Sequence, residues 1–411
     1  MRLLIALFLS FWLALTAVAQ PAPTSVTVPV TLDHNRIIID VRFPLPDGST
    51  KRVRCWVDTG NPDMWMTERL ATKLGLQLSG EPQDAYFAKQ RKAQVPSVLL
   101  IGGMEVHPTG IKEVHAMLDR ESIGPGLSAE VNLPSLVLRN YDVIVDYPNR
   151  EFTLAAPGTK HLEGAPAKVT INPENGLIQV PSMIEGQNYS LGLDVGAPFG
   201  LISGDLVAKW RHNHPPWPHM IGATGAANLW GIDDEPRWEL LRIPAVQYGG
   251  VMLSGVGVAA YPKEYLDWFE KRAGVPTVGL MGANALLNYR VGMDYAHSTV
   301  YFQKTGKFTA PDMDVVGLIL RPEPDGSYTV IGVADYAGKA SVAEVKAGDV
   351  LVAIDKVPAK GGTMGQVWSL LSGSPGDVRT LTLERAGKEF TVKATVHRFL
   401  AAAPQGKAVH K

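Results

Sequence analysis

An internal repeat limits the folds that this chain can adopt. Residues 57–62 read VDTGNP and residues 193–198 read LDVGAP, so the second copy follows the first at an offset of 194 − 58 = 136 positions. The match continues at the same offset, where Thr67 aligns with Ser203. Each of these hydroxyl residues precedes an amphipathic stretch, which is the position of a helix N-cap.

Two further echoes follow in the same order along the chain. They pair residues 95–104 with residues 243–251, and residues 140–147 with residues 288–295. Three ordered echoes predict two homologous lobes, residues 24–165 and residues 166–305. The offset grows to 148 at the last echo, which places a longer insertion in the second lobe, most naturally at residues 212–234.

Composition predicts a mainly β fold without a nucleic-acid partner. The 41 glycines and 30 prolines separate short apolar runs, a spacing typical of many short strands and turns. Lysine and arginine together number 39 against 40 acidic residues, and no strongly basic stretch is present. Binding to nucleic acid therefore has no electrostatic support.

The N-terminus predicts export. Arg2 is followed by an apolar run and then by the small-residue pattern AVA at residues 17–19, as in a signal peptide of residues 1–19. The apolar run is shorter than the ~20 residues of a membrane-spanning helix, which disfavours an anchor. We expect a periplasmic or secreted bacterial protein, not inserted in a membrane after cleavage, with a disordered tail at residues 399–411.

Cysteine usage agrees with a fold that has no disulfide bond, because Cys55 is the only cysteine. It lies in the alternating stretch RCWV at residues 54–57, which favours a buried strand position.

Asp58 and Asp194 are the candidate catalytic residues. A single Asp-Thr-Gly could be an Asx-turn at a strand end. Two copies in homologous lobes would be brought together by a pseudo-twofold axis. Two carboxyls in one small space cannot both ionise, so one holds a proton while its partner is an anion. Such a pair can act as base toward a water and as acid toward a carbonyl oxygen, without a metal or another cofactor.

These motifs, together with GLMGANAL at residues 279–286, resemble the retropepsin and pepsin superfamily of aspartic proteases. The resemblance is strongest to bacterial two-lobed members that carry a PDZ domain, and it covers most of residues 25–398. It implies two β lobes around a cleft, a hairpin flap over the cleft, and cleavage of extended polypeptides by Asp58 and Asp194. It also implies a set of residues that support the active-site loops: Thr59, Gly60, Val195, Gly196 and Gly282.

The sequence departs from the family pattern at positions that support the aspartates. Val195 stands where a threonine is expected, and Pro134 stands where the second lobe has Gly282. Asn61 replaces a small residue. Two functions therefore stay open: an active exported aspartic endopeptidase with an acid-shifted pH optimum, and a degraded peptide-binding protein that retains the fold.

The sequence leaves the flap and the insertion unassigned. Tyr86 and Phe87 are candidates for the flap aromatic residue, and residues 222–225 (GATG) suit either the turn of a corresponding hairpin or an ordinary turn. Three histidines at residues 212–219 suggest a metal site, but the prolines among them and the lack of other nearby ligands favour a rigid loop. We therefore predict no metal.

Residues 312–398 are expected to form a separate C-terminal domain. GLIL at residues 317–320 and AGDVLVAID at residues 347–355 resemble PDZ domains, which bind peptide C-termini or internal strands by strand addition. The resemblance implies a PDZ-like β-barrel. It also implies a set of peptide-binding residues: Gly317, Leu318, Ile319 and Leu320. Alternatively, the two leucines are only core residues and the groove is closed or filled in cis. The groove-facing residue of the predicted helix at 365–371 is either Val367 or Trp368.

Overall fold

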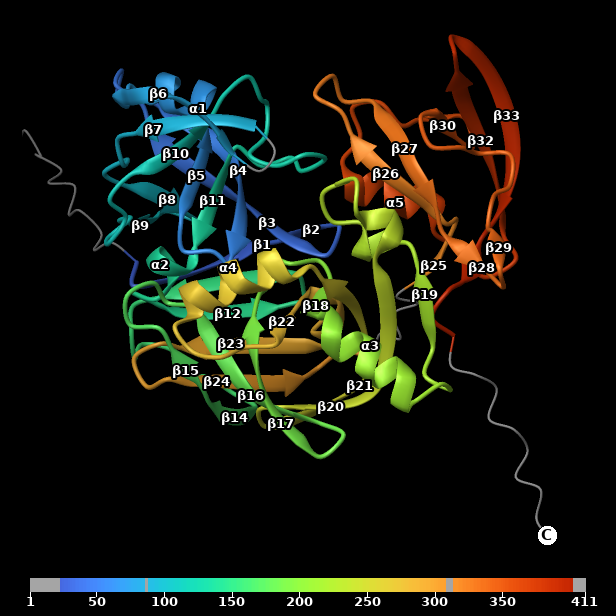
Figure 1. The fold of residues 1–411 in the computed structure, drawn as a ribbon. Coiled ribbons are helices and arrows are strands. Elements are labelled where there is room, and N and C mark those ends of the chain that lie inside the picture. Colours follow the sequence, from blue (N-terminus) through green and yellow to red (C-terminus); the bar gives the residue numbers. More distant parts are fainter. Residues whose placement is uncertain (1–22, 86–87, 308–312, 402–411) are drawn as a thin grey trace, which may run out of the picture.

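The computed structural model describes residues 23–85, 88–307 and 313–401 (Figure 1). Strands dominate these residues, which confirms the prediction of a mainly β protein. Within the described ranges, no helix is both long enough and apolar enough to cross a membrane. Several predictions fall outside the described residues: the signal peptide, the flap candidates Tyr86 and Phe87, and residues 402–411 of the tail. The start of the predicted tail at residue 399 is wrong, because Phe399 and Leu400 are buried and the Phe399 amide donates to the Met313 carbonyl at 3.1 Å.

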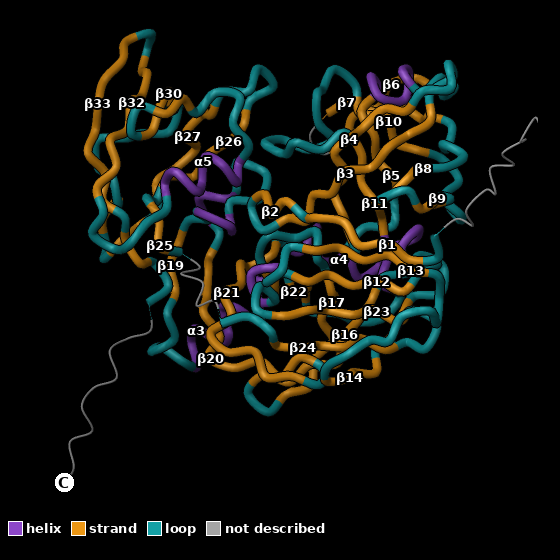
Figure 2. The backbone as a smooth tube through the Cα atoms, turned by 180° about the vertical axis from the view of Figure 1, so that it is seen from behind, coloured by secondary structure: helices purple, strands orange, loops and turns teal. Residues whose placement is uncertain are grey.

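A six-stranded antiparallel sheet joins the two lobes that precede the C-terminal domain. Its order is β1 (Ser25–Pro29), β13 (Glu151–Ala155), β12 (Asp142–Asp146), β23 (Tyr289–Asp294), β24 (Thr299–Lys304) and β14 (Ala165–Lys168). Figure 2 shows it running from β1 beside the first lobe to β14 on the far side. Ile144 faces Gly292 in the central pair, a separation of 292 − 144 = 148, equal to the offset of the last sequence echo. A pseudo-twofold axis therefore passes through this pair.

Lobe 1 is built on a ten-stranded sheet. Its strands are β2 (Thr31–Asp33), β3 (Arg36–Pro44), β4 (Thr50–Asp58), β5 (Met64–Thr67), β6 (Leu78–Ala85), β7 (Ala88–Ala93), β8 (Leu99–Ile101), β9 (Met104–Val106), β10 (Val114–Met117) and β11 (Val131–Pro134). Strand β4 lies inside the sheet between β3 and β11. Its buried residues include Val53, Cys55 and Val57, so the alternating sequence forms a strand with one face in the core. The prediction of a buried Cys55 is confirmed.

Lobe 2 is built on an eight-stranded sheet. Its strands are β15 (Thr170–Ile171), β16 (Ile178–Ile184), β17 (Gln187–Leu193), β18 (Gly200–Ser203), β19 (His219–Ile221), β20 (Glu239–Tyr248), β21 (Val251–Tyr261) and β22 (Gly279–Met281). Strand β17 pairs in parallel with β22, as β4 pairs with β11 in lobe 1. Strand β18 pairs in parallel with β21, as β5 pairs with β10. The two lobes therefore have the same strand arrangement around β4 and β17, the strands that lead to Asp58 and Asp194.

Short helices follow the strands of both lobes. They are α1 (Glu68–Lys73) and α2 (Ser135–Leu138) in lobe 1, and α3 (Gly204–Asn213), α4 (Lys263–Ala273) and the 3₁₀ turns η1 (Gly225–Ala227), η2 (Glu235–Arg237) and η3 (Ala283–Ala285) in lobe 2. Helix α1 is equivalent to α3 and α2 is equivalent to η3, whereas, among the described residues, α4, η1 and η2 belong to lobe 2 alone. Thr67 caps α1 by accepting a hydrogen bond from the Leu70 amide at 3.2 Å, as predicted. Ser203 is the N-cap residue of α3 but makes no capping bond with its side chain.

The C-terminal domain is a third β unit. It comprises β25 (Asp314–Val315), β26 (Leu318–Pro322), β27 (Tyr328–Val333), β28 (Asp335–Tyr336), β29 (Lys339–Ala340), β30 (Val350–Ile354), β31 (Val357–Pro358), α5 (Met364–Leu371), β32 (Val378–Arg385), β33 (Lys388–Thr395) and β34 (His397–Arg398). Six of these strands form one sheet, in which β26 is at the edge. Helix α5 begins with a capping box between Thr363 and Gln366, and its residues fall where the sequence predicts a helix.

The C-terminal domain shares a hydrophobic core with lobe 2. One cluster of buried residues contains Leu229 and Leu240 of lobe 2 together with Leu318, Leu320 and Tyr328 of the C-terminal domain. Figure 1 shows β26 and α5 next to the yellow-green segment of lobe 2 that precedes β20. This contact fixes the C-terminal domain beside the cleft between the lobes.

Candidate active site

Asp58 and Asp194 occupy equivalent positions in the two lobes. Asp58 is the last residue of β4, and Asp194 directly follows the last residue of β17. Each strand is flanked by a parallel partner, with Val57 opposite Leu133 and Leu193 opposite Met281. The chain must bend where these interior strands end, which places both carboxyls at the junction of the lobes. Both side chains are buried, Asp58 at 2% and Asp194 at 9% exposure.

The two aspartate loops approach each other closely and reciprocally. A Cβ on Gly60 would collide with the carboxylate of Asp194. A Cβ on Gly196 would lie 2.8 Å from Oδ1 of Asp58 and 3.0 Å from Oδ1 of Asp194. Real Cβ atoms do not come this close to a carboxyl oxygen, so glycine is required at both positions for steric reasons. The structure thus brings together four of the predicted site residues.

Burial and proximity raise the pKa of both carboxyls. Removal from water raises the pKa of Asp58 well above its usual value, and the nearby charge of Asp194 raises it further. Burial raises the pKa of Asp194 to about 6, and amide N–H groups limit the rise by stabilising the anion. Asp194 accepts bonds from the amides of Gly196 at 2.8 Å and Ala197 at 3.1 Å. Because burial and proximity both disfavour two charges, the pair favours a state that holds one proton.

Thr59 connects the two aspartate loops through its hydroxyl. Its Oγ1 donates to the carbonyl of Leu193 at 2.9 Å and accepts from the amide of Val195 at 2.9 Å. Val195 is fully buried at the equivalent position but has no hydroxyl, so it cannot make the reciprocal pair of bonds. The support between the loops is therefore one-sided, as the sequence predicts.

Pro134 preserves the support that the sequence places in doubt. Its φ of −82° is close to the −92° of Gly282, and proline adopts such values without strain. The amide after Pro134, that of Ser135, donates to the carbonyl of Asn61 at 3.0 Å. The amide after Gly282 makes the equivalent bond to Ala197 at 2.8 Å. The substitution of proline for glycine thus leaves this part of the aspartate loop unchanged.

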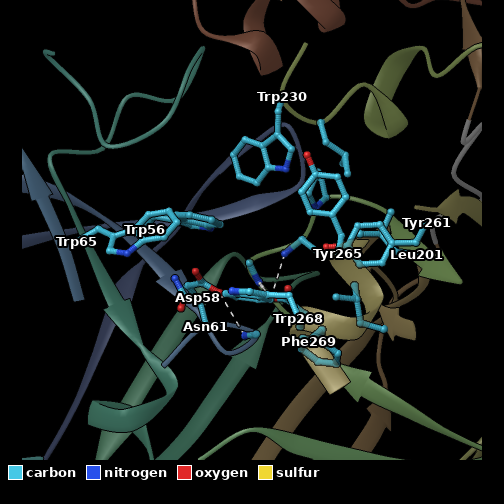
Figure 3. A pocket seen from close by; sticks show the side chains of 17 residues that line it. Trp56, Asp58, Asn61, Trp65, Leu201, Trp230, Tyr261, Tyr265, Trp268 and Phe269 are labelled. Carbon is cyan, nitrogen blue, oxygen red and sulfur yellow. Dashed lines mark hydrogen bonds between the residues drawn. The ribbon is translucent and has the colours of Figure 1, made fainter. Parts of the chain in front are cut away.

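A pocket lined mainly by aromatic side chains opens above the aspartates (Figure 3). Trp56 and Trp65 come from lobe 1 and lie opposite Tyr261 and Tyr265 of lobe 2. The other lining side chains include Leu201, Leu229, Trp230, Trp268, Phe269 and Leu280. The walls are apolar and the floor carries the two carboxyls, so the pocket can bury an apolar group next to a reacting polar one.

A buried cation lies behind the pocket wall. Arg36 is fully buried, donates from Nη2 to the carbonyl of Leu229 at 2.8 Å, and has its guanidinium carbon 4.6 Å from the centroid of the Trp230 ring. Burial lowers its pKa to about 10, so it remains charged at neutral pH. Its positive charge favours the ionised form of both aspartates and so opposes part of the pKa rise that burial causes.

Of the two alternatives for residues 222–225, a tight hairpin turn is not what the structure shows between β19 and β20. Residues 222–225 follow β19, but the return strand begins only at Glu239. Between them the chain forms η1 and η2, and the buried Glu235 accepts hydrogen bonds from the amides of Trp230 at 2.8 Å and Gly231 at 3.0 Å. Burial raises the pKa of Glu235 to about 7. None of the described strands pairs with the 17 residues from 222 to 238, so hydrogen bonds within the segment hold its conformation.

The histidines of the insertion have separate surroundings. The ring of His214 stacks on Trp217 with centroids 4.4 Å apart, and its Nε2 lies 3.3 Å from a Glu185 oxygen. Across the described residues, no three side chains of metal-binding type converge on one point. His212 lies in the last turn of α3 and His219 begins β19, so the predicted loop is limited to residues 214–218.

The predicted peptide-binding residues of the C-terminal domain lie away from the aspartates, around the start of the edge strand β26. Leu318, Ile319 and Leu320 are buried, and a Cβ on Gly317 would clash with the side chains of Ser341 and Phe399. Val367 is buried in the domain core, whereas Trp368 contacts Gly225 of lobe 2. Of the two candidates, Trp368 is therefore the residue of α5 that faces out of the domain core, toward Gly225.

Sequence reasoning missed the aromatic wall and the buried arginine. Trp56 could have been found, because it lies two residues before Asp58 on one strand and so on the same face. Trp230 and Trp268 come from lobe 2 segments without counterparts in the repeat, so the repeat gives no signal for them. Arg36 begins an apolar strand, where an arginine is normally exposed.

No protein-family model matches this chain, and no curated protein matches its sequence. The functional assignment therefore rests on the residues and their geometry.

Proposed function

We propose that this chain is an exported aspartic-type endopeptidase with a C-terminal PDZ-type domain. The observation that carries the proposal is the reciprocal placement of the two buried aspartates, each beside the glycine of the opposite loop. In this proposal the two sheets are the protease lobes, and the pocket between them is the substrate cleft. Asp58 and Asp194 are the catalytic residues, supported by Thr59 and by the loop glycines.

The reaction uses the single proton of the aspartate pair. A water between the carboxyls gives a proton to the ionised Asp194 as its oxygen attacks the peptide carbonyl carbon. Asp58 gives its proton to the carbonyl oxygen, which forms a neutral tetrahedral diol. Collapse of the diol returns one hydroxyl proton to Asp58. The proton on Asp194 goes to the leaving nitrogen, so the pair ends with the one proton it began with.

The pKa values move the expected pH optimum toward neutrality. The singly protonated pair exists above the lower titration step and below the upper one. The pKa of Asp194 is raised to about 6, and burial raises the pKa of Asp58 well above its usual value. Activity should therefore rise as pH increases through about 6 and fall where Asp58 ionises, whereas the sequence alone predicts only an acid-shifted optimum.

The substrate class is an unfolded or extended polypeptide with large apolar side chains next to the scissile bond. Aromatic walls on both sides of the carboxyls favour such side chains, because burying them removes apolar surface from water. Export to the periplasm or beyond, after loss of residues 1–19, is part of the same proposal and rests on the N-terminal sequence.

Cleavage of an unfolded protein by mature wild type and by Asp58→Asn and Asp194→Asn tests the proposal. We expect cleavage by the wild type and a loss of about 10³-fold or more in each variant, because neither remaining group can carry out both proton transfers. Asp205→Asn is the control, since Asp205 is exposed in the first turn of α3. Cleavage that survives in either active-site variant would refute the two-aspartate mechanism.

The second candidate is a peptide-binding protein that has lost cleavage. The one-sided bonding of Thr59 opposite Val195 favours it. Absence of cleavage by folded wild type at every pH from 4 to 8, with retained binding of an unfolded chain, would select this candidate.

A further inference from the structure

A segment of lobe 2 lies along the free edge of β26. Among the described strands β26 pairs with β27 alone, so its other edge is open to an added strand. Asn228 fills that place with its side-chain amide. Its Oδ1 accepts from the Leu320 amide at 2.9 Å, and its Nδ2 donates to the Leu320 carbonyl at 3.1 Å. These are the two backbone groups of Leu320 that a bound peptide strand would use.

Neighbouring residues of the segment occupy the rest of the space between β26 and α5. Thr224 donates from Oγ1 to the carbonyl of Leu318 at 2.9 Å. A Cβ on Gly225, whose φ is +54°, would lie 2.5 Å from Nε1 of Trp368 on α5. Since no side chain fits there, the backbone of residues 224–225 itself fills the groove on the helix side.

The same segment also forms part of the pocket above the aspartates, beginning at the residue after Asn228. Leu229 and Trp230 directly follow Asn228 and both line the pocket above the aspartates. Nδ2 of Asn228 also donates to Glu235, which holds the amides of Trp230 and Gly231. Asn228 therefore links the edge of β26 to the wall of the pocket through one short, rigid stretch of chain.

We propose that residues 222–231 are an internal ligand of the C-terminal domain, and that Asn228 is a positioning residue for Trp230. The C-terminal domain thereby shapes the substrate cleft instead of only recruiting substrates. An extended peptide can add to β26 only by displacing Asn228. This displacement would free Trp230 to move from its place in the pocket wall. The effect on cleavage rests on the proposed function, whereas the occupancy of the groove does not.

Hydrogen exchange of single amides tests the occupancy without any need for activity. We expect the Leu320 amide to be protected in the mature full-length wild type and to exchange at least about tenfold faster in Asn228→Ala. The Val330 amide, which donates to Asp349 inside the domain, should keep its protection in both proteins. A Leu320 amide that exchanges freely in the wild type, or equally in both, would overturn the proposal.

Thr224→Val is the second variant, because it keeps the side-chain shape and removes the bond to Leu318. Asn149→Ala is the matched control, since the side chain of Asn149 bonds to Asp146 within the β12–β13 turn and not to β26. We expect faster Leu320 exchange in Thr224→Val, by a smaller factor than in Asn228→Ala, and no change in Asn149→Ala. A Thr224→Val protein that folds and shows unchanged exchange around residues 318–320 would contradict the proposal.

Kinetics test the link to the pocket. In Asn228→Ala we expect KM to rise by about tenfold for a peptide with a large aromatic residue at the scissile bond, with a small change in kcat, because binding is weakened without loss of the carboxyls. A peptide with alanine there should show little change. Equal loss for both peptides, or a loss in kcat alone, would contradict a positioning role for Asn228. An inactive wild type would instead refute the proposed function and leave the exchange result to decide this inference.

Discussion

The two aspartate loops have nearly the same backbone but different side-chain support. Pro134 and Gly282 adopt similar φ values and hold equivalent amide-to-carbonyl bonds, although one residue is the most restricted and the other the least. Thr59 and Val195 occupy equivalent positions, but only the hydroxyl of Thr59 bridges the loops. Backbone geometry, more than residue identity, therefore maintains the site.

The loops also differ in how they stabilise charge. Asp194 accepts amide hydrogen bonds at 2.8 and 3.1 Å, whereas the bond from Gly60 to Asp58 is 3.2 Å long. Short bonds from N–H donors stabilise an anion more than long ones. The lobe 2 loop therefore holds the carboxylate and the lobe 1 loop holds the carboxylic acid.

The largest expected effect comes from removing the single bridging hydroxyl. Thr59→Val would leave the Leu193 carbonyl and the Val195 amide buried without their partner and should cost about 2–4 kcal/mol of unfolding free energy. We expect the Tm to fall by about 2–4 °C per kcal/mol, measured by calorimetry. Thr27→Val is a suitable control, because its hydroxyl bonds only to Thr153 on β13. Equal loss in both variants would deny the bridge a special role.

Removing the lobe 2 carboxylate should stabilise the fold in a pH-dependent way. The pKa of Asp194 is raised to about 6 in the folded state, so the protonated carboxyl favours folding. Its contribution to the free energy of unfolding is fully present below about pH 4 and is lost as pH rises through about 6. Asp194→Asn should therefore be more stable than wild type at pH 8, by about 2–3 kcal/mol, and no more stable at pH 3.5. Urea unfolding at the two pH values checks this sign. A variant less stable than wild type at pH 8 would contradict it.

Restoring symmetry should have a smaller effect. Val195→Thr introduces a hydroxyl where the pseudo-twofold axis places the equivalent of Thr59, with little change in volume. We expect a gain of about 1 kcal/mol in unfolding free energy, because the new hydroxyl can bond across to the lobe 1 loop. Denaturant unfolding measures it. Destabilisation by a similar amount would mean that the loops are not related by the symmetry at this position.

The smallest change in unfolding free energy is expected at Pro134, which supports the lobe 1 aspartate loop. Pro134→Gly keeps the backbone conformation but increases the freedom of the unfolded chain, which should cost about 0.4–1 kcal/mol. Rates of cleavage should stay within about twofold of wild type, since the Ser135–Asn61 bond does not depend on the proline. A large loss of cleavage with a normal Tm would show that Pro134 acts directly on the aspartate loop.

The sequence predicts the parts of the site that the repeat contains. Asp58 and Asp194 each follow an apolar strand and occupy the same place in the internal repeat. Their equivalence is therefore visible without a structure. Thr59 and Val195 are recognised as unequal for the same reason. The prediction of a buried strand at Cys55 also follows from local alternation.

The rest of the site depends on contacts that no local pattern encodes. Trp230 and Trp268 reach the pocket from segments that only lobe 2 contains. Arg36 is buried because Leu229 and Trp230, almost 200 positions away, supply its hydrogen bond and its aromatic contact. Asn228 looks like an ordinary loop residue until β26 lies beside it.

Direct titration of the two aspartates tests the central claim, that a buried pair shares one proton across the lobe junction. The carboxyl carbons of Asp58 and Asp194 can be followed by ¹³C NMR from pH 3 to 9, with each resonance assigned by its loss in the corresponding Asn variant. We predict that Asp194 ionises near pH 6 and that the pKa of Asp58 lies well above that of a solvated aspartate. Two independent ionisations near pH 4, as for solvated aspartates, would contradict the account.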